Sequence, residues 1–350
     1  MHMADALISP AVGGAMWAAT AGLTFYSARK LKEEMDERRI PLMGVMGALV
    51  FAAQMINFTI PGTGSSGHLG GGLLLAILLG PHAAFLTMAS ILTIQALFFA
   101  DGGLLSLGCN IFNMGFFPCF VAFPYIYKKI ASNRGPKRVL TASLAASIAG
   151  LQLGAVGVVV ETVFSAVSEL SFGTFVLLMQ PIHLAIGIVE GLVTASLVGF
   201  VYKTRPELLE TATESAGDKA ISIKPVLVTL IIIAAFTGGM LSWFASANPD
   251  GLEWSISRSS GDKALQSTES RIHTLLTEVQ KRVAIFPDYN FRKDKTDESE
   301  NSEKTQEKGD VWPAVNAGTS VSGLLGGTMT LVLAGLIGFG IRIFQKRTHK

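Results

Sequence analysis

Runs of about 20 apolar residues are the feature that most constrains this chain, because each is long enough to cross a hydrocarbon core of about 30 Å as a helix. The length of 350 residues alone would allow two soluble domains. The composition overrides that interpretation, since 49% of the residues are hydrophobic and 15% are charged, which is typical of membrane proteins. The 37 glycines are expected where helix backbones approach closely in lipid.

We therefore predict an all-α polytopic membrane protein with about nine transmembrane segments. The third segment is short and rich in glycine, which indicates a broken or only partly spanning helix buried in the protein. Cys109 and Cys119 show no metal or redox spacing, and we interpret both as packing residues. The predicted segments are 9–29, 40–58, 68–81, 83–100, 109–127, 139–164, 173–202, 225–247 and 314–342.

Basic residues in the short loops predict the orientation in the membrane. Lys and Arg follow the first, fifth and seventh segments and recur near the C-terminus, whereas loops 59–67, 101–107 and 165–172 contain neither. Because cytoplasmic loops carry an excess of Lys and Arg, we expect the N-terminus outside and the C-terminus inside. No basic leader precedes the first apolar run, so a cleavable signal peptide is not expected.

One extracytoplasmic insertion, about 248–313, is predicted between the last two segments. It opens with the turn signal Pro249-Asp250-Gly251. The charged stretch 292–310 lacks aromatic residues and is expected to be a disordered linker. Apolar residues at helical spacing predict one amphipathic helix in this region. These residues are Leu265, Ile272, Leu275, Leu276, Val279 and Val283.

The first two residues carry three nitrogen donors close together. The free amine of Met1, the deprotonated amide of His2 and the His2 Nδ1 atom can chelate one ion through a five- and a six-membered ring. His68 could supply the fourth nitrogen of the plane. Such a plane favours Ni(II) or Cu(II) over zinc, magnesium or calcium. The hypothesis requires Met1 to be retained with a free amine. The alternative to a metal site is that the histidine stands at position 2 by chance.

The stretch Gly62-Thr63-Gly64-Ser65-Ser66-Gly67 matches the pattern G-x-G-x-x-G but is not a dinucleotide motif, because it follows a predicted span and lacks a βαβ context. No Lys follows the glycines, which also excludes a phosphate-binding P-loop. We interpret the stretch as a flexible turn in which the Ser65 and Ser66 hydroxyls approach closely and His68 is aimed inward. A simple interhelical turn is the alternative.

Four motifs are found at Met1–Met3, Pro61–Leu69, Gln95–Gly103 and Gly108–Met114. Together they resemble one family, the substrate-capture component of energy-coupling-factor transporters for nickel and cobalt. The segment Pro249–Glu253 with Phe286–Tyr289 resembles the small accessory component of the same systems, fused here to the C-terminal side. Ala4 departs from many relatives, which have Pro at this position.

The resemblance implies that Met1, His2 and His68 are the metal ligands, with Ni(II) as transported substrate and Co(II) as the alternative. It implies a transmembrane coupling subunit and two cytoplasmic ATPase subunits as partners, and a location in the cytoplasmic (inner) membrane of a prokaryote. No nucleotide bound by this chain and no nucleic acid are expected. The implied domains are a metal-capture domain at 1–205, a cytoplasmic linker at 206–224, and an accessory domain at 225–350 whose two transmembrane helices flank 248–313.

Polar side chains near the predicted outer ends gain interest with this resemblance. A metal-bound imidazole normally donates its other N–H to an acceptor. Interhelical hydrogen bonds are the alternative role. The candidates are Asn57, Ser65, Ser66, Gln95, Asp101, Asn110 and Asn113.

Ionisable residues within predicted spans are functional candidates by default. Glu161, His183 and Glu190 are of this kind, and either a role in the metal path or structural pairing is open. We interpret three further histidines as incidental, namely His82, His273 and His349.

Small residues recur at four-residue spacing in the first segment, at Ala11, Ala15 and Ala19. Such a face allows close helix approach. The resemblance suggests that it meets the coupling subunit; packing inside this chain is the alternative.

Three other classes of function are weighed. A membrane metalloenzyme keeps an open metal position for water or substrate, which a filled four-nitrogen plane lacks. A stand-alone secondary transporter would accumulate metal without ATPases, and a structural adaptor would not bind metal. We expect a transport component and no catalytic residues.

Overall fold

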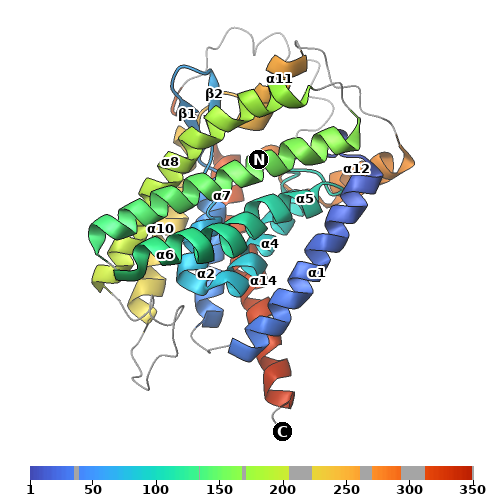
Figure 1. The fold of residues 1–350 in the computed structure, drawn as a ribbon. Helices are drawn as coiled ribbons and strands as arrows, with labels where there is room; N and C mark the ends of the chain where they lie inside the picture. The colour runs from blue at the N-terminus through green and yellow to red at the C-terminus, as the bar shows by residue number, and fades with distance from the viewer. Residues whose placement is uncertain are drawn as a thin grey trace.

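The computed structural model describes residues 1–34, 39–133, 135–167, 171–204, 223–260, 270–292 and 312–348, and it is mostly helical (Figure 1). Long helices run through the middle of the molecule. The strands and the short helices α11 and α12 lie at one end, and the C-terminus lies at the other (Figure 1). The orientation in the membrane stays a prediction.

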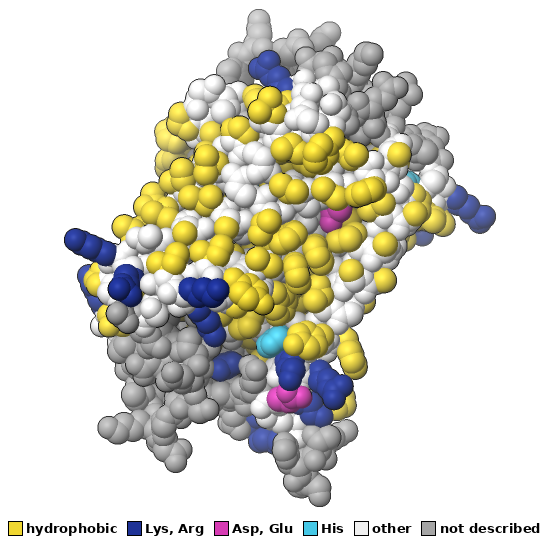
Figure 2. Space-filling view, viewed as in Figure 1, with side chains coloured by type: hydrophobic (Ala, Val, Ile, Leu, Met, Phe, Trp, Pro, Cys, Tyr) yellow, Lys and Arg dark blue, Asp and Glu magenta, His cyan; other side chains and the backbone are white. Residues whose placement is uncertain are grey.

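In the described part of the chain, five helices are long and apolar enough to cross a membrane, by length and composition. Each coincides with a predicted segment. They are α4 (Pro81–Phe98), a continuous helix formed by α5 (Leu107–Ile111), η2 (Phe112–Tyr127) and α6 (Lys128–Ile130), then α7 (Pro136–Ser165), α8 (Phe172–Thr204) and α14 (Ala317–Thr348). Figure 2 shows hydrophobic side chains over the middle of one face and several Lys and Arg side chains at its left and lower edges.

The other predicted spans fall on helices outside this set. Helix α1 (Pro10–Glu34) has 25 residues, while α2 (Arg39–Gln54) and α10 (Lys224–Gly239) are apolar with 16 residues each. Helix α3 (Gly72–Leu79) has only eight residues, all buried. It matches the expected short, buried third segment. The count of nine spans stays a prediction.

The connection between α2 and α3 is a β-hairpin and not the flexible turn that the glycines suggested. Strand β1 (Phe58–Ile60) pairs antiparallel with β2 (Ser65–Gly67), with Thr59 opposite Ser66. Gly62 and Gly64 adopt φ of 79° and 76°, a left-handed conformation that glycine tolerates. Strand β2 also pairs, through Ser66, with a distant segment at Asp250.

The C-terminal part packs against the N-terminal part within the helical bundle. Helices α10 and α14 both lie against α2. A Cβ atom at Gly44 would lie 2.7 Å from the Leu331 carbonyl oxygen, so the small residue lets the two backbones approach. Near the hairpin, η4 (Leu241–Phe244) is followed by α11 (Gly251–Ser260), α12 (Arg271–Val283) and η5 (Pro287–Tyr289).

The predicted amphipathic helix is confirmed as α12, which begins after the N-cap Ser270. Leu265 and all but the first residue of 292–310 lie outside the described residues, as does His349. Helix α11 was not predicted, because its mixed apolar sequence shows no clear period. Cys109 and Cys119 are buried and form no disulfide, in agreement with a packing role.

Candidate metal centre

The N-terminal residues are packed into the protein. Met1 is only 7% exposed. Its terminal methyl carbon packs against α7, where a Cβ atom added at Gly154 would lie 3.3 Å from it. The Met3 N–H donates to Asn110 Oδ1 at 2.8 Å, and the Met3 carbonyl accepts from the Ser106 hydroxyl at 2.5 Å. The first three residues are thus held in place by side chains of the loop and helix that follow α4.

The C-terminal part of the chain also holds the N-terminus. The Met1 amine lies 3.8 Å from Asp250 Oδ2. His273 Nε2 contacts the carbonyl oxygens of Ile8, at 2.9 Å, and Asp5, at 3.1 Å. His273 is therefore not incidental, as the sequence suggested. Its role was missed because its partners are backbone atoms distant in sequence.

His68 follows β2, and the hairpin is fastened on both sides. On one side, the Ser66 N–H donates to the Pro249 carbonyl and the Ser66 hydroxyl to the Asn248 carbonyl, each at 2.8 Å. On the other side, the Glu190 carboxylate accepts the N–H of Gly70 at 2.7 Å and that of Gly71 at 3.2 Å. A left-handed backbone at Gly71, with φ of 78°, then starts α3.

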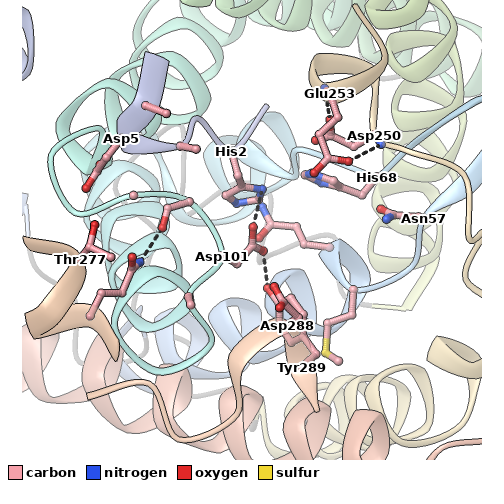
Figure 3. Close-up of a pocket in the computed structure, with 18 of the residues that line it drawn as sticks. His2, Asp5, Asn57, His68, Asp101, Asp250, Glu253, Thr277, Asp288 and Tyr289 are labelled. Carbon is pink, nitrogen blue, oxygen red and sulfur yellow. Dashed lines mark hydrogen bonds and ion pairs between the residues drawn. The ribbon is translucent and has the colours of Figure 1, made fainter. Parts of the chain in front are cut away.

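These two segments bring the imidazoles of His2 and His68 together. The rings stack with centroids 5.0 Å apart and planes inclined by 30° (Figure 3). The His2 side chain is 7% exposed. The two histidines that the sequence singles out are therefore neighbours, and both lie next to the buried N-terminus.

A chain of hydrogen bonds determines which nitrogen of His2 carries the proton. The Gly70 carbonyl can only accept, so the Gln54 amide nitrogen donates to it at 2.8 Å. Gln54 Oε1 then accepts from Gln95 Nε2 at 2.8 Å. Gln95 Oε1 consequently faces His2 Nε2 at 3.1 Å and must accept from it. The relay thus places the ring proton on Nε2 and leaves Nδ1 free.

The tautomer of His68 follows from a single contact. His68 Nδ1 lies 3.1 Å from the carbonyl oxygen of Leu69, which can only accept, so Nδ1 carries the proton and Nε2 is free. Burial lowers the pKa of His68, and the charge of the nearby Met1 ammonium lowers it further, to about 3. Burial also lowers the pKa of His2. Both rings are therefore neutral near pH 7, each with one nitrogen free to bind a cation.

A cavity of about 570 Å³ lies beside the imidazoles (Figure 3). Among the described residues that line it, five carry carboxylates and none is Lys or Arg. Burial by itself raises the pKa of Asp250, but the Met1 ammonium outweighs this effect and the net direction is downward. The cavity is therefore suited to cations. The carboxylates are those of Asp5, Asp101, Asp250, Glu253 and Asp288.

Of the remaining candidates, Asp101 lies beside the His2 ring and the others make other contacts. Asp101 Oδ1 is 3.6 Å from His2 Nδ1, and Asn57 lines the cavity. The Ser65 hydroxyl contacts that of Thr63 at 2.7 Å. Asn113 donates to Glu161 Oε2 at 2.7 Å, which agrees with structural pairing for that carboxylate.

His183 lies close to the centre without contacting it directly. It is 1% exposed, and its Nδ1 atom contacts the Met179 carbonyl at 2.8 Å. It lines a second, very small cavity together with Met1 and His68. His82 is in ring contact with Tyr26 and Phe120. Glu190 was considered for a metal path, and the structure shows it capping the two glycines before α3.

The side chains alone do not form a metal site. Within the described ranges, no three His, Cys, Asp or Glu side chains converge in a way that could hold an ion. An ion between His2 and His68 would need the backbone nitrogens of Met1 and His2 as well. This donor set suits a metal that accepts a nitrogen-rich plane.

Known proteins with related sequences are metal transporters. The "Fused nickel transport protein NikMN" of Rhodobacter capsulatus is 33% identical over 257 residues, 68% of this chain and 74% of that protein. The "Cobalt transport protein CbiM" of Geobacter sulfurreducens is 28% identical, over 67% of this chain and 69% of that protein. A crystal structure described as a transition metal transporter is 30% identical with a TM-score of 0.53, covering 59% of this chain and 95% of the other.

Two protein families match consecutive parts of the chain. Residues 2–208 match the family "Cobalt uptake substrate-specific transmembrane region", and residues 224–343 match the "PDGLE domain". The first match covers more than half of the chain and contains His2 and His68. The chain therefore belongs to the family of cobalt uptake substrate-specific transmembrane regions, fused to a PDGLE domain, and it is a membrane transport component and not an enzyme.

Proposed function

We propose that this chain captures Ni(II) outside the membrane for an ATP-driven energy-coupling-factor importer. The ion is bound by the Met1 amine, the His2 amide, His2 Nδ1 and His68 Nε2. It is released inward when two ATPase subunits, acting through a transmembrane coupling subunit, reorient the protein. In the proposed orientation, with nine spans, the N-terminus lies outside, where the metal arrives.

One observation carries this proposal, namely the stacking of His2 on His68 at 5.0 Å beside a buried Met1. The relay through Gln95 supports it, because it leaves free the same ring atom, Nδ1, that can close a six-membered chelate with the amide. The burial of Met1 supports a role for its amine, since an uninvolved N-terminus is normally exposed and poorly ordered.

Nickel is proposed first and cobalt second. Four nitrogens in a plane favour Ni(II) over ions that prefer tetrahedral or oxygen-rich sites. The relative from Rhodobacter is named a fused nickel transport protein, and this chain also matches two families joined in one chain. The relative from Geobacter is named for cobalt. The same donors accept both ions.

Helix α1 offers the surface proposed for the coupling subunit. Its residues Ala11, Gly14, Ala15 and Ala18 are exposed, and a Cβ atom at Gly14 would meet nothing within 4 Å. The opposite face packs inside the chain, where the Thr20 hydroxyl donates to the Gly108 carbonyl at 2.8 Å. The small-residue face therefore remains free to pack closely against another helix.

The test is equilibrium binding of Ni(II) and Co(II) to the purified full chain. Wild type is compared with His2→Ala, His68→Ala and a variant with two residues added before Met1. The added residues remove the free amine and spare both imidazoles, so all three variants should lose high-affinity binding. Unchanged affinity in the extended variant would refute the chelate. A matched extension at the C-terminus controls for the added residues.

A further inference from the structure

Helix α12 carries a row of apolar side chains that the protein leaves about half exposed. Ile272, Leu275 and Val279 are between 46% and 52% exposed. At about 100° per residue, the three side chains lie within about 60° of one another on the helix surface, and we call them the α12 stripe. The apolar side of a surface helix normally packs against the core. Contiguous apolar residues that face outward instead mark a surface that contacts another protein or a membrane.

A different side of α12 attaches the helix to the protein. His273 Nε2 contacts the Ile8 carbonyl oxygen at 2.9 Å. Gln280 Nε2 donates to the carbonyl oxygens of Ala96, at 2.9 Å, and Gly102, at 2.7 Å, and Gln280 also lines the cavity beside the imidazoles. His273 and Gln280 are seven residues apart and share one side of the helix, about a third of a turn away from the α12 stripe. The stripe is therefore not needed to dock α12 onto the bundle.

The third side of α12 is charged, with an excess of basic residues. Arg271, Glu278 and Lys281 are exposed and lie roughly a third of a turn from each of the other two sides. Arg282 is also exposed and lies between this charged side and the α12 stripe. The Arg292 guanidinium donates to the Lys281 carbonyl, which adds a further cation at the C-terminal end of the helix. The surface beside the stripe is therefore complementary to anionic groups.

The contacts of α12 place it at the level where helices of membrane-crossing length end. Ala96 lies in the last turn of α4, which is long and apolar enough to cross a membrane, and Ile8 lies just before α1 (Figure 1). Helix α14 begins beside η5, which follows α12 in the chain. Before α14, the exposed Trp312 ring packs edge to face against Phe244, with centroids 5.4 Å apart. Exposed aromatic side chains at helix ends are typical of the boundary between lipid and water.

We propose that α12 is an interfacial helix, whose stripe inserts among the lipid acyl chains and whose basic residues contact anionic phospholipid headgroups. A helix with an apolar face and Lys and Arg on its polar face binds in this plane of a membrane, and basic residues near an anionic leaflet are attracted to it. Helix α12 then stands between lipid on one side and the cavity beside the imidazoles on the other. The lipid thereby anchors the helix that holds Ile8 and Gly102 in place.

The first test labels the full chain with a thiol-reactive bimane at Leu275→Cys or, as the matched control one turn away on the charged side, at Glu278→Cys. Wild type measures background labelling, since Cys109 and Cys119 are buried. The vesicles contain phosphatidylcholine and phosphatidylglycerol, with iodide on both sides of the membrane.

Phospholipid brominated on its acyl chains should quench the Leu275→Cys label, and iodide should quench it several-fold less than the Glu278→Cys label. Equal quenching of both labels by iodide would place the stripe in water and overturn the proposal. Protection of the Leu275→Cys label from both quenchers would also overturn it, because protein and not lipid would then cover the stripe. Thermal unfolding in detergent confirms that each labelled variant is folded.

The second test removes charge with Lys281→Gln and Arg282→Gln together, and leaves Arg292 in place because it bonds to the helix. Phosphatidylglycerol should increase quenching of the stripe label by brominated lipid relative to phosphatidylcholine alone, and the neutralised variant should lose this increase. Lys128→Gln with Lys129→Gln, the same charge change at exposed residues of α6, should keep it. An increase that survives in the neutralised variant, or is lost in both, would overturn the headgroup contact. Both tests are done without metal, so their outcome is distinct from failure of the proposed function.

Discussion

The amine of Met1 lies 3.8 Å from Asp250 Oδ2, so the first residue of the chain meets the PDGLE motif that begins at Pro249. The same motif pairs with the hairpin, through the Ser66 N–H and the Pro249 carbonyl. The accessory region therefore contacts both segments that carry the proposed ligands. Because both parts belong to one chain, the contacts of the PDGLE motif with Met1 and with the hairpin are intramolecular.

The relay from Gly70 to His2 leads to the first prediction. Gln95→Met preserves the shape of the side chain but removes the acceptor that holds Nε2–H. The His2 ring then loses its fixed tautomer and orientation, and Ni(II) affinity should fall by about 10- to 100-fold. Gln152→Met is the control, since Gln152 donates to the Gln180 carbonyl and does not line the cavity beside the imidazoles. Equal nickel affinities in the two variants would contradict the role of the relay.

The second prediction concerns pH. A base with a lowered pKa stays neutral to more acidic pH, so His68, with a pKa of about 3, should be neutral throughout pH 5 to 9. Metal affinity should still rise with pH, because binding displaces protons from the backbone nitrogen donors. Nickel titrations across this range measure the slope. NMR of the metal-free protein follows the rings, and an ordinary midpoint near 6.5 for His68 would contradict the burial described here.

The third prediction addresses assembly. Ala15→Leu adds bulk to the exposed small-residue face of α1 and should block docking of the coupling subunit while leaving Ni(II) binding unchanged. Co-purification of the subunits and equilibrium metal binding measure the two properties. Ser196→Leu, an exposed position on α8, should assemble normally. If Ala15→Leu lost metal binding instead, the face would belong to the interior of the fold.

The fourth prediction concerns the start of α3. Gly71 has a φ of 78°, and an added Cβ atom would lie 2.5 Å from a methyl carbon of Val50. Gly71→Ala should therefore lower the free energy of unfolding by about 1–3 kcal/mol and displace the loop that carries His68. Gly199→Ala, in α8 with nothing near its Cβ position, should be neutral or slightly stabilising. Thermal unfolding in detergent compares the two, and equal stability would argue against strain at Gly71.

Several parts of the fold could be predicted from sequence because they depend on local patterns. Apolar runs indicated the long helices, and the spacing of Ile272, Leu276 and Val279 indicated α12. The hairpin could not be predicted in this way. Its strands have three residues each, and Ser66 is held by Asn248 and Pro249, which are far away in sequence.

The sequence by itself determined that the chain is a membrane protein with nitrogen donors at its N-terminus and a candidate histidine after a glycine-rich loop, since hydrophobicity and donor chemistry belong to the residues themselves. Only the tertiary structure decided that His2 and His68 stack, that Gln54 and Gln95 set the His2 tautomer, and that Asp101 faces the free nitrogen. The physical reason is that a hydrogen bond requires its atoms within about 3 Å. Helices α2, α4 and α8 must pack before those atoms can meet.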